Sequence, residues 1–486
     1  MHSNEDAGVL VPVGDSGRRS SSALGRALVA DALRGVDGPG AAAAERVTNW
    51  RSGYLGPFRR LVEAGLGSRA AALSIAADGL SAAHRRMTIR GADGAEVPLA
   101  AFDPGEQQPR RLATTEVAGD AAPETELTVP LRGSRLGGAE LSRRLDAWCA
   151  AGVLEPSAAE RIREVAAHPE WLRLEGRTVV VLGAGAEMGP LPALLRWGAR
   201  VAAVDLPIAD IWQRIRKVPS AGRLLLPTDA AGRSPEAGLD LLTEPDAAVG
   251  WIASLDGAPV LGNYVYADGV TNLRLSCAVD LVTDLLQRIR PEVALAFLAT
   301  PTDVFAVPPE AVEFALTAYA NRSRTARLLG RPLRAVSAGR LLRRPYVAGV
   351  EPGINDALVP QQGPNYALAK RLQRWRATVA RDRGTLVSMN VAPPTRTRSV
   401  VRNRALAAAY AGAHRFGVEV FEPATANTLM AALLVADLHT GGGPAHPHPW
   451  QDEAFAAVHG GLWRTPYEPR SALGLAAVLG YGAARA

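Results

Sequence analysis

Short apolar runs alternate with helical patterns over residues 175–438, and this alternation constrains the fold more than any other feature of the chain. Residues 178–182 and 293–299 are almost wholly apolar, as expected for strands that are covered on both faces of a sheet. Strands that are joined through helices return to the same edge of the sheet and therefore pair in parallel. The pattern predicts an α/β fold with a doubly wound parallel sheet, with further strands at residues 200–204, 223–226, 385–389 and 418–421.

Shifts in composition predict four regions along the chain. Residues 1–45 are rich in Gly, Ala and Ser, which indicates a weakly ordered lead-in. Residues 46–170 show apolar residues at helical spacing, which indicates a mainly helical N-terminal domain. The α/β domain is expected over residues 171–440, and residues 441–486 form a C-terminal extension.

Composition excludes several classes of protein. With 48% hydrophobic and 21% charged residues, the chain has the balance of a globular protein. No apolar stretch reaches the ~20 residues of a membrane-spanning helix, so we expect no integral membrane association. The net charge of +6 is small and no nucleic-acid-binding motif accompanies it, so no nucleic-acid partner is expected. The absence of a secretory signal pattern and the presence of only 2 cysteines favour a cytoplasmic protein.

A glycine-rich turn, with Gly183, Gly185 and Gly189, follows the first strand predicted in the α/β domain. Glycine lets the backbone bend sharply and lets a pyrophosphate approach, while the N–H groups that open the next helix bind phosphate. Asp205 ends the next predicted strand, where a carboxylate accepts hydrogen bonds from the adenosine ribose and repels a 2′-phosphate. The turn therefore predicts a site for NAD, with NADP less favoured; the alternative is a tight turn that binds no ligand.

Tyr366 and Lys370 lie four residues apart on a predicted helix, so their side chains share one face. A nearby ammonium favours the phenolate and lowers the tyrosine pKa from its usual value of ~10, which makes tyrosine an effective acid–base at neutral pH. Lysine is rare in this chain, because Lys217 is the only other one among the 54 basic residues. The pair predicts a catalytic acid–base, and the alternative is an ordinary pair on a helix surface.

Taken together, these segments resemble the short-chain dehydrogenase/reductase superfamily over residues 175–438. The resemblance implies a Rossmann-type fold in which the glycine turn binds the pyrophosphate and Asp205 selects NAD. It also implies that Asp229, after the third strand, lies near the adenine. Tyr366 would move the proton of the substrate oxygen, and Lys370 would hold the nicotinamide ribose and tune the tyrosine. The segment 390–397 resembles the family's proline-containing segment beside the nicotinamide.

The chain departs from the family pattern at several positions. Glu187 stands where the family has glycine, and its carboxylate would face the pyrophosphate unless it turns away. Residues 299–303 replace the expected asparagine–alanine–glycine turn after the strand at 293–299. No serine lies about a dozen residues before the tyrosine, and Asn355 is the residue there that can donate a hydrogen bond to a carbonyl. The long spacing from Gly183 to Tyr366 predicts insertions around residues 251–268 and 321–345.

The leading hypothesis is an NAD(H)-dependent oxidoreductase that acts on a small carbonyl or alcohol substrate, with Tyr366, Lys370 and Asn355 in catalytic roles. A non-redox nucleotide-binding regulator or scaffold is the second hypothesis, and a lyase or isomerase that reuses Tyr366 is the third. The superfamily commonly forms dimers and tetramers, which makes a homo-oligomer possible.

Two weaker patterns lie outside these motifs. Eight arginines between residues 321 and 344 indicate either a solvated helix face or a surface for anionic groups. Four histidines near the C-terminus lack ligand spacing typical of zinc, so no metal site is expected; they are His439, His446, His448 and His459.

Overall fold

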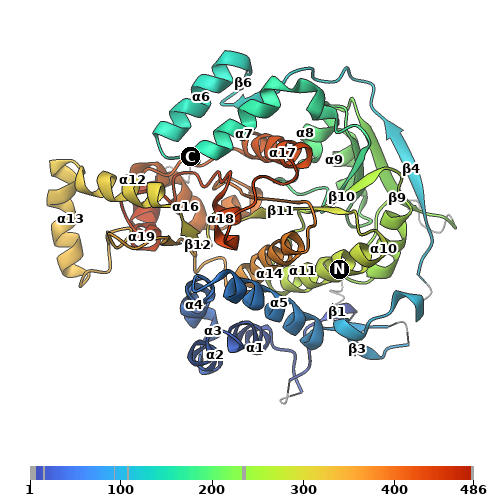
Figure 1. Cartoon of the computed structure of the whole chain (residues 1–486), viewed down its shortest axis with the longest axis horizontal. Coiled ribbons are helices and arrows are strands. Elements are labelled where there is room, and N and C mark those ends of the chain that lie inside the picture. Colours follow the sequence, from blue (N-terminus) through green and yellow to red (C-terminus); the bar gives the residue numbers. More distant parts are fainter. Residues whose placement is uncertain (1–6, 15–16, 92, 107–108, 232–236, 483–486) are drawn as a thin grey trace.

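The computed structural model describes residues 7–14, 17–91, 93–106, 109–231 and 237–482. Within these residues, the main sheet has seven strands in the order β14-β11-β10-β7-β8-β9-β4 (Figure 1). All neighbours pair in parallel except the edge strand β4, which runs antiparallel to β9. The strands are β4 (Leu112–Ala118), β7 (Arg177–Leu182), β8 (Arg200–Val204), β9 (Arg223–Asp229), β10 (Ala258–Asn263), β11 (Ala294–Ala299) and β14 (Val387–Val391).

The order of the parallel strands reverses beside β7. The chain adds β8 and β9 on one side of β7, and then crosses back to add β10, β11 and β14 on the other side. Leu182, at the end of β7, therefore pairs with Asn263 at the end of β10 and with Val204 at the end of β8. In open α/β sheets a ligand binds outside the carboxyl ends of the strands at such a reversal.

Helices cover both faces of the sheet. Successive residues of a strand point to opposite sides, so a wholly apolar strand has apolar side chains on both faces, and both need to be covered. In β7, Val179 and Val181 belong to one buried cluster, whereas Val180 and Leu182 belong to another. The first cluster includes side chains of α7 (Pro156–Ala167), α8 (Leu191–Arg196), α9 (Ala209–Arg216) and α17 (Pro423–Thr440). The second includes side chains of α5 (Arg69–Arg86), α10 (Pro245–Ala253), α11 (Gly269–Ile289) and α14 (Pro364–Asp382). Both layers are visible in Figure 1.

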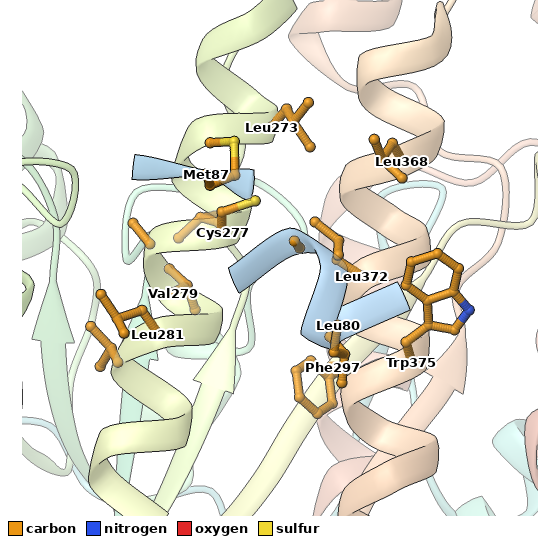
Figure 2. Packing of buried hydrophobic residues seen from close by; sticks show 14 of the residues in the cluster. Leu80, Met87, Leu273, Cys277, Val279, Leu281, Phe297, Leu368, Leu372 and Trp375 are labelled. Carbon is orange, nitrogen blue, oxygen red and sulfur yellow. The ribbon is translucent and has the colours of Figure 1, made fainter. Parts of the chain in front are cut away.

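The N-terminal helices pack onto the helices of the sheet rather than around a separate core. Figure 2 shows Leu80 of α5 among the side chains of α11 and α14, with Phe297 of β11 beneath. The Asp280 carboxylate of α11 also joins these layers, accepting from Arg376 Nε of α14 at 2.7 Å and lying 2.7 Å from His84 Nε2 of α5.

Residues 21–45, expected to be weakly ordered, form two helices, so that expectation is wrong for them. Ser20 caps the first helix by accepting a hydrogen bond from the Ala23 N–H, and Leu28 and Leu33 are fully buried in the core. These two helices are α1 (Ser21–Arg34) and α2 (Gly38–Glu45). The remaining N-terminal elements are α3 (Trp50–Gly53), α4 (Leu55–Gly65), α6 (Gly138–Ala150), β1 (Gly8–Leu10), β2 (Thr88–Arg90), β3 (Glu96–Pro98), β5 (Val129–Leu131) and β6 (Ser134–Leu136).

Two other expectations about strands are wrong. Residues 251–268, expected to be an insertion, contain the central strand β10. Residues 418–421 form no strand, and Phe421 makes a single bridge to Thr395. The other expected insertion, residues 321–345, lies within the segment between β11 and α14, and we call this whole segment the inserted unit. It contains β12 (Val304–Val307), α12 (Pro309–Ala320), α13 (Arg324–Val336) and β13 (Gly353–Asp356).

Four helices complete the C-terminal part of the chain: α15 (Arg398–Arg402), α16 (Arg404–Gly412), α18 (Pro449–Ala454) and α19 (Pro469–Gly480). Across all the described residues, no helix is both long and apolar enough to cross a bilayer.

Gly79 tests the packing between α5 and α14. A Cβ atom on Gly79 would lie 2.4 Å from a ring carbon of Trp375, so we expect Gly79→Ala to destabilise the fold by about 1–3 kcal/mol. Gly250→Ala in α10 is the matched control, because nothing lies within 4 Å of its added Cβ. Gly250→Ala should stabilise by about 0.5–1 kcal/mol through helix propensity. Urea unfolding measures both changes, and equal effects of the two variants would contradict the packing.

Candidate functional site

A cleft of about 1150 Å³ lies at the carboxyl ends of the parallel strands. Each of five strands contributes to the lining at its carboxyl end. These residues are Gly183 after β7, Asp205 after β8, Asn263 of β10, Thr300 after β11 and Pro393 after β14. The cleft therefore spans the point between β7 and β10 where the strand order reverses. Its volume exceeds the ~300–1,000 Å³ of sites for a drug-sized ligand.

The glycine turn forms one end of the cleft, and its first glycine is required by geometry. Gly183 has φ +80°, and a Cβ atom there would lie 2.9 Å from the backbone of Val265. Its N–H bonds to the Val204 carbonyl at 2.9 Å, which ties the turn to the neighbouring strand β8. Gly185 also lines the cleft. Gly189 does not line it, and its N–H closes the turn on the Ala186 carbonyl at 3.1 Å.

Asp205 braces the glycine turn as well as lining the cleft. Its Oδ2 accepts from the Gly185 N–H and its Oδ1 from the Leu206 N–H, each at 2.8 Å. Each oxygen retains a second lone pair for a further donor. Asp229 lies outside the lining of the cleft: it is buried at the end of β9, and its Oδ1 accepts from the Ala231 N–H at 3.2 Å.

The Glu187 carboxylate turns toward the segment that follows β14. Its Oε2 accepts from the Arg398 N–H at 2.8 Å, and its Oε1 lies 3.1 Å from Arg398 Nε. The negative charge is thus paired with a guanidinium. In the described part of the chain, the N–H groups of Glu187 and Met188 have no hydrogen-bond acceptor, and both residues line the cleft. These amides are available to an anionic ligand.

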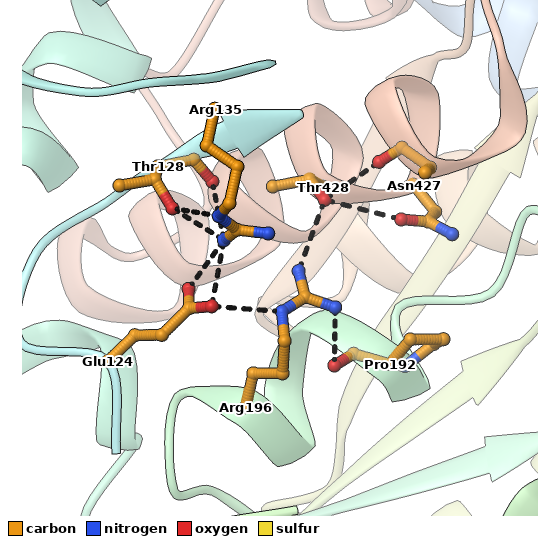
Figure 3. A network of polar contacts seen from close by, with 8 residues as sticks. Glu124, Thr128, Arg135, Pro192, Arg196, Asn427 and Thr428 are labelled. Carbon is orange, nitrogen blue, oxygen red and sulfur yellow. Dashed lines mark hydrogen bonds and ion pairs between the residues drawn. The ribbon is translucent and has the colours of Figure 1, made fainter. Parts of the chain in front are cut away.

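A polar network fixes the short helix α8 that follows the turn (Figure 3). Arg196 Nε donates to Glu124 at 3.1 Å, and its Nη1 donates to the Pro192 carbonyl at 3.0 Å. On α17, Asn427 Nδ2 donates to the Glu187 carbonyl at 3.3 Å. The turn is therefore held from behind by residues far apart in the sequence.

Tyr366 and Lys370, in the first turns of α14, lie at the other end of the same cleft, and both side chains are half-buried. Burial raises the pKa of Tyr366 to about 12, although the nearby Thr300 hydroxyl acts in the opposite direction. Burial lowers the pKa of Lys370 to about 8. The expectation that the Lys370 charge lowers the pKa of Tyr366 is wrong for this geometry, because the effects of burial on the phenol dominate.

Lys370 Nζ instead bonds to interior oxygens. It donates to the Leu298 carbonyl at 3.3 Å and to Gln373 Oε1 at 3.1 Å. Gln373 Nε2 in turn donates to Asn263 Oδ1 at 3.3 Å. This chain of hydrogen bonds links the lysine to the ends of β10 and β11.

Thr300 is a functional candidate that the sequence analysis missed, and Asn355 is a wrong one. Asn355 is buried in β13, outside the lining of the cleft, and its Nδ2 donates to Tyr346 Oη at 3.1 Å and to the Leu462 carbonyl at 3.0 Å. The inserted unit separates β11 from α14, so the hydroxyl beside Tyr366 comes from the end of β11 instead. The signal was the pair of threonines, Thr300 and Thr302, directly after an apolar strand.

Buried ion pairs fix α14 against the loop that carries Thr300. Asp303 is 1% exposed, and it accepts from Arg371 Nη2 at 2.8 Å and from Arg374 Nη1 at 2.7 Å. Arg374 also donates to Glu453 of α18. The two arginine charges hold the pKa of Asp303 below its usual range despite its burial.

Aromatic and N-terminal residues close the end of the cleft near Tyr366. The rings of Tyr266 and Tyr366 meet edge to face, with centroids 6.3 Å apart, and Tyr410 also lines the cleft. Ser21 and Arg51, from α1 and α3, line it as well. The N-terminal helices therefore contribute to the site, which nothing in their sequence indicated.

The four C-terminal histidines contact different partners. His439 stacks on Trp171, His446 Nδ1 lies 2.8 Å from Asp452, His448 contacts the Gly65 carbonyl, and His459 contacts Glu155. Among the residues that the structure describes, no group of three or more His, Cys, Asp or Glu side chains is arranged to hold a metal ion.

No family model and no curated protein matches this chain. Its chemistry is therefore inferred from the geometry of the cleft.

The pKa of Lys370 is directly testable because the chain has so few lysines. After reductive methylation with ¹³C-formaldehyde, the NMR signal that disappears in a Lys370→Arg variant should titrate near pH 8, because burial disfavours the charged amine. A midpoint at or above the ordinary lysine value of ~10.4 would show that the amine is solvated rather than buried in the cleft wall.

Proposed function

We propose that this protein is an NAD(H)-dependent oxidoreductase that reduces a carbonyl group, on a Rossmann-type fold of the short-chain dehydrogenase/reductase kind. The observation that carries the proposal is the single cleft, which has the glycine turn and Asp205 at one end and Tyr366 and Lys370 at the other. A cytoplasmic location and a homo-oligomeric state remain predictions from the sequence.

The residues at the glycine turn fit a dinucleotide. Gly183 allows close backbone approach, and the amides of Glu187 and Met188 would bind the pyrophosphate. The pairing of Glu187 with Arg398 removes the repulsion that its carboxylate would otherwise exert on a phosphate. Asp205 would accept from the adenosine ribose hydroxyls and disfavour a 2′-phosphate, so NAD(H) is preferred to NADP(H). Asp229 lies outside the cleft lining, so nothing in the geometry assigns it to the adenine.

The residues at the other end of the cleft fit proton donation to a carbonyl oxygen. When bound, NADH supplies the hydride that reduces the carbonyl carbon. With a pKa of about 12, Tyr366 stays protonated at neutral pH and can donate its proton to the oxygen as negative charge develops there. The Thr300 hydroxyl, which lies near Tyr366, would help to position the phenol, and Lys370 places an amine with a lowered pKa in the same wall.

A second function keeps the nucleotide site without redox turnover. The raised pKa of Tyr366 means that few molecules carry a phenolate at neutral pH. This disfavours any function that needs Tyr366 as a base, including a lyase or isomerase in which it removes a proton, and leaves the non-redox function as the second candidate. Binding of NADH without turnover of any carbonyl or alcohol would favour a regulator or scaffold. Absence of binding for both NADH and NADPH at millimolar concentration would remove the oxidoreductase proposal.

Asp205→Asn tests the cofactor preference while keeping an acceptor for the Gly185 N–H. The loss of the charge should weaken the binding of NADH by about tenfold, because a charge-assisted hydrogen bond is replaced by a neutral one. The affinity for NADPH should fall less or should rise, because the 2′-phosphate of NADPH no longer meets a carboxylate. Fluorescence titration with both cofactors measures this, and equal losses would count against the assignment of the ribose.

Tyr366→Phe tests the acid. In a screen of aldehydes and ketones followed by NADH absorbance, the variant should lose about 10²–10⁴-fold in kcat, since the proton donor is removed. NADH affinity should be unchanged. Tyr319→Phe, outside the lining of the cleft, is the control and should retain full activity. Full turnover by Tyr366→Phe would refute the catalytic role.

A further inference from the structure

The helix α13 projects from the body of the molecule as part of the inserted unit (Figure 1). Its arginines Arg324, Arg327, Arg331 and Arg334 are spaced three, four and three residues apart, so they form a stripe on one face of the helix. All four are exposed. In the part of the chain that the structure describes, none of them forms an ion pair with a carboxylate.

The same helix exposes apolar side chains next to this stripe. The exposed fractions are 65% for Leu328, 38% for Leu333 and 90% for Val336. In the loop that follows, Val347 and Val350 are 70% and 50% exposed. A thirteen-residue helix that buries so few of its side chains gains little from packing against its own protein.

We propose that α13 docks this protein on the surface of an anionic lipid bilayer. Residues 322–344 contain eight arginines and no acidic residue, so the segment complements a negatively charged surface. A helix with an arginine face and an adjacent apolar face lies in the interface of a bilayer, with the charges at the headgroups and the aliphatic side chains below them.

The composition of the segment argues against other occupants of this surface. A second copy of α13 would bring four like charges against four, which disfavours a symmetric contact between the helices. Nucleic acid would satisfy the arginines but offers no apolar layer for Leu328 and Val336. A bilayer that contains acidic lipids provides both chemistries.

Within the inserted unit, contacts of Tyr319 in α12 hold α13 in place. The Arg322 guanidinium lies 3.2 Å from the centroid of the Tyr319 ring, and Arg334 donates to the Tyr319 hydroxyl. The Tyr467 ring packs edge to face against Tyr319, with centroids 5.9 Å apart. These contacts orient α13 and do not involve the cleft, so the surface can act whether or not the protein binds a dinucleotide.

Co-sedimentation of the full chain with vesicles tests the proposal. The protein should bind vesicles of phosphatidylcholine with 30% phosphatidylglycerol, should bind pure phosphatidylcholine much less, and should be released by salt. Replacing the four arginines of α13 by glutamine should weaken binding at least about tenfold. Leu328→Ser with Val336→Ser should also weaken binding, because the apolar contribution is lost.

The matched control replaces four exposed arginines elsewhere, Arg85, Arg143, Arg216 and Arg383, by glutamine and should bind like the parent protein. Unfolding temperature should change little in the α13 variants, since these side chains are exposed; the hydrogen bond from Arg334 to Tyr319 is a contact that the four-arginine variant loses. Equal losses in the control and the α13 variant would mean that net charge alone drives binding and would overturn the proposal. Absence of vesicle binding would also overturn the proposal. In that case, sedimentation velocity and binding to duplex DNA would show whether α13 supports self-association or binds nucleic acid instead.

Discussion

The buried contact between Asp303 and two arginines of α14 is the interaction on which the geometry of the cleft depends. It fixes the helix that carries Tyr366 and Lys370 against the loop that carries Thr300. A carboxylate that is 1% exposed is tolerated because Arg371 and Arg374 satisfy both of its oxygens. If either arginine is absent, Asp303 keeps only one of its two guanidinium partners and the buried cluster is left with one unpaired negative charge, at a typical cost of about 3–5 kcal/mol. The end of the cleft that holds Tyr366 and Lys370 is therefore fixed by buried ion pairs beneath it.

Sequence patterns predicted the parts of the fold in which one periodicity dominates. The strand predicted at residues 200–204 is β8, because an apolar run bounded by polar residues has one plausible reading. The central strand β10 was missed because Pro259 and Gly262 lie inside it and are usually signs of a loop. The helices at residues 21–45 were missed because their Gly- and Ala-rich composition is typical of a linker, whereas tertiary packing of a few leucines stabilises them.

The same contrast applies to the site. Gly183, Asp205, Tyr366 and Lys370 were predicted from local motifs, and they line one cleft because parallel topology brings the strand ends together. Thr300 and Arg51 belong to no motif, since their positions depend on how the inserted unit and the N-terminal helices fold back. The raised pKa of Tyr366 was also beyond reach, because it comes from burial by residues distant in sequence.

The layer formed by α5, α11 and α14 has a consequence during synthesis of the chain. His84 meets Asp280 across 196 residues, and at about 5–20 residues per second the ribosome needs roughly 10–40 s to make the intervening segment. Until then α5 lacks the helices α11 and α14, among whose side chains Leu80 is packed in the folded protein. The nascent chain therefore exposes this face of α5 for that time, and a molecular chaperone would find there an apolar surface to hold.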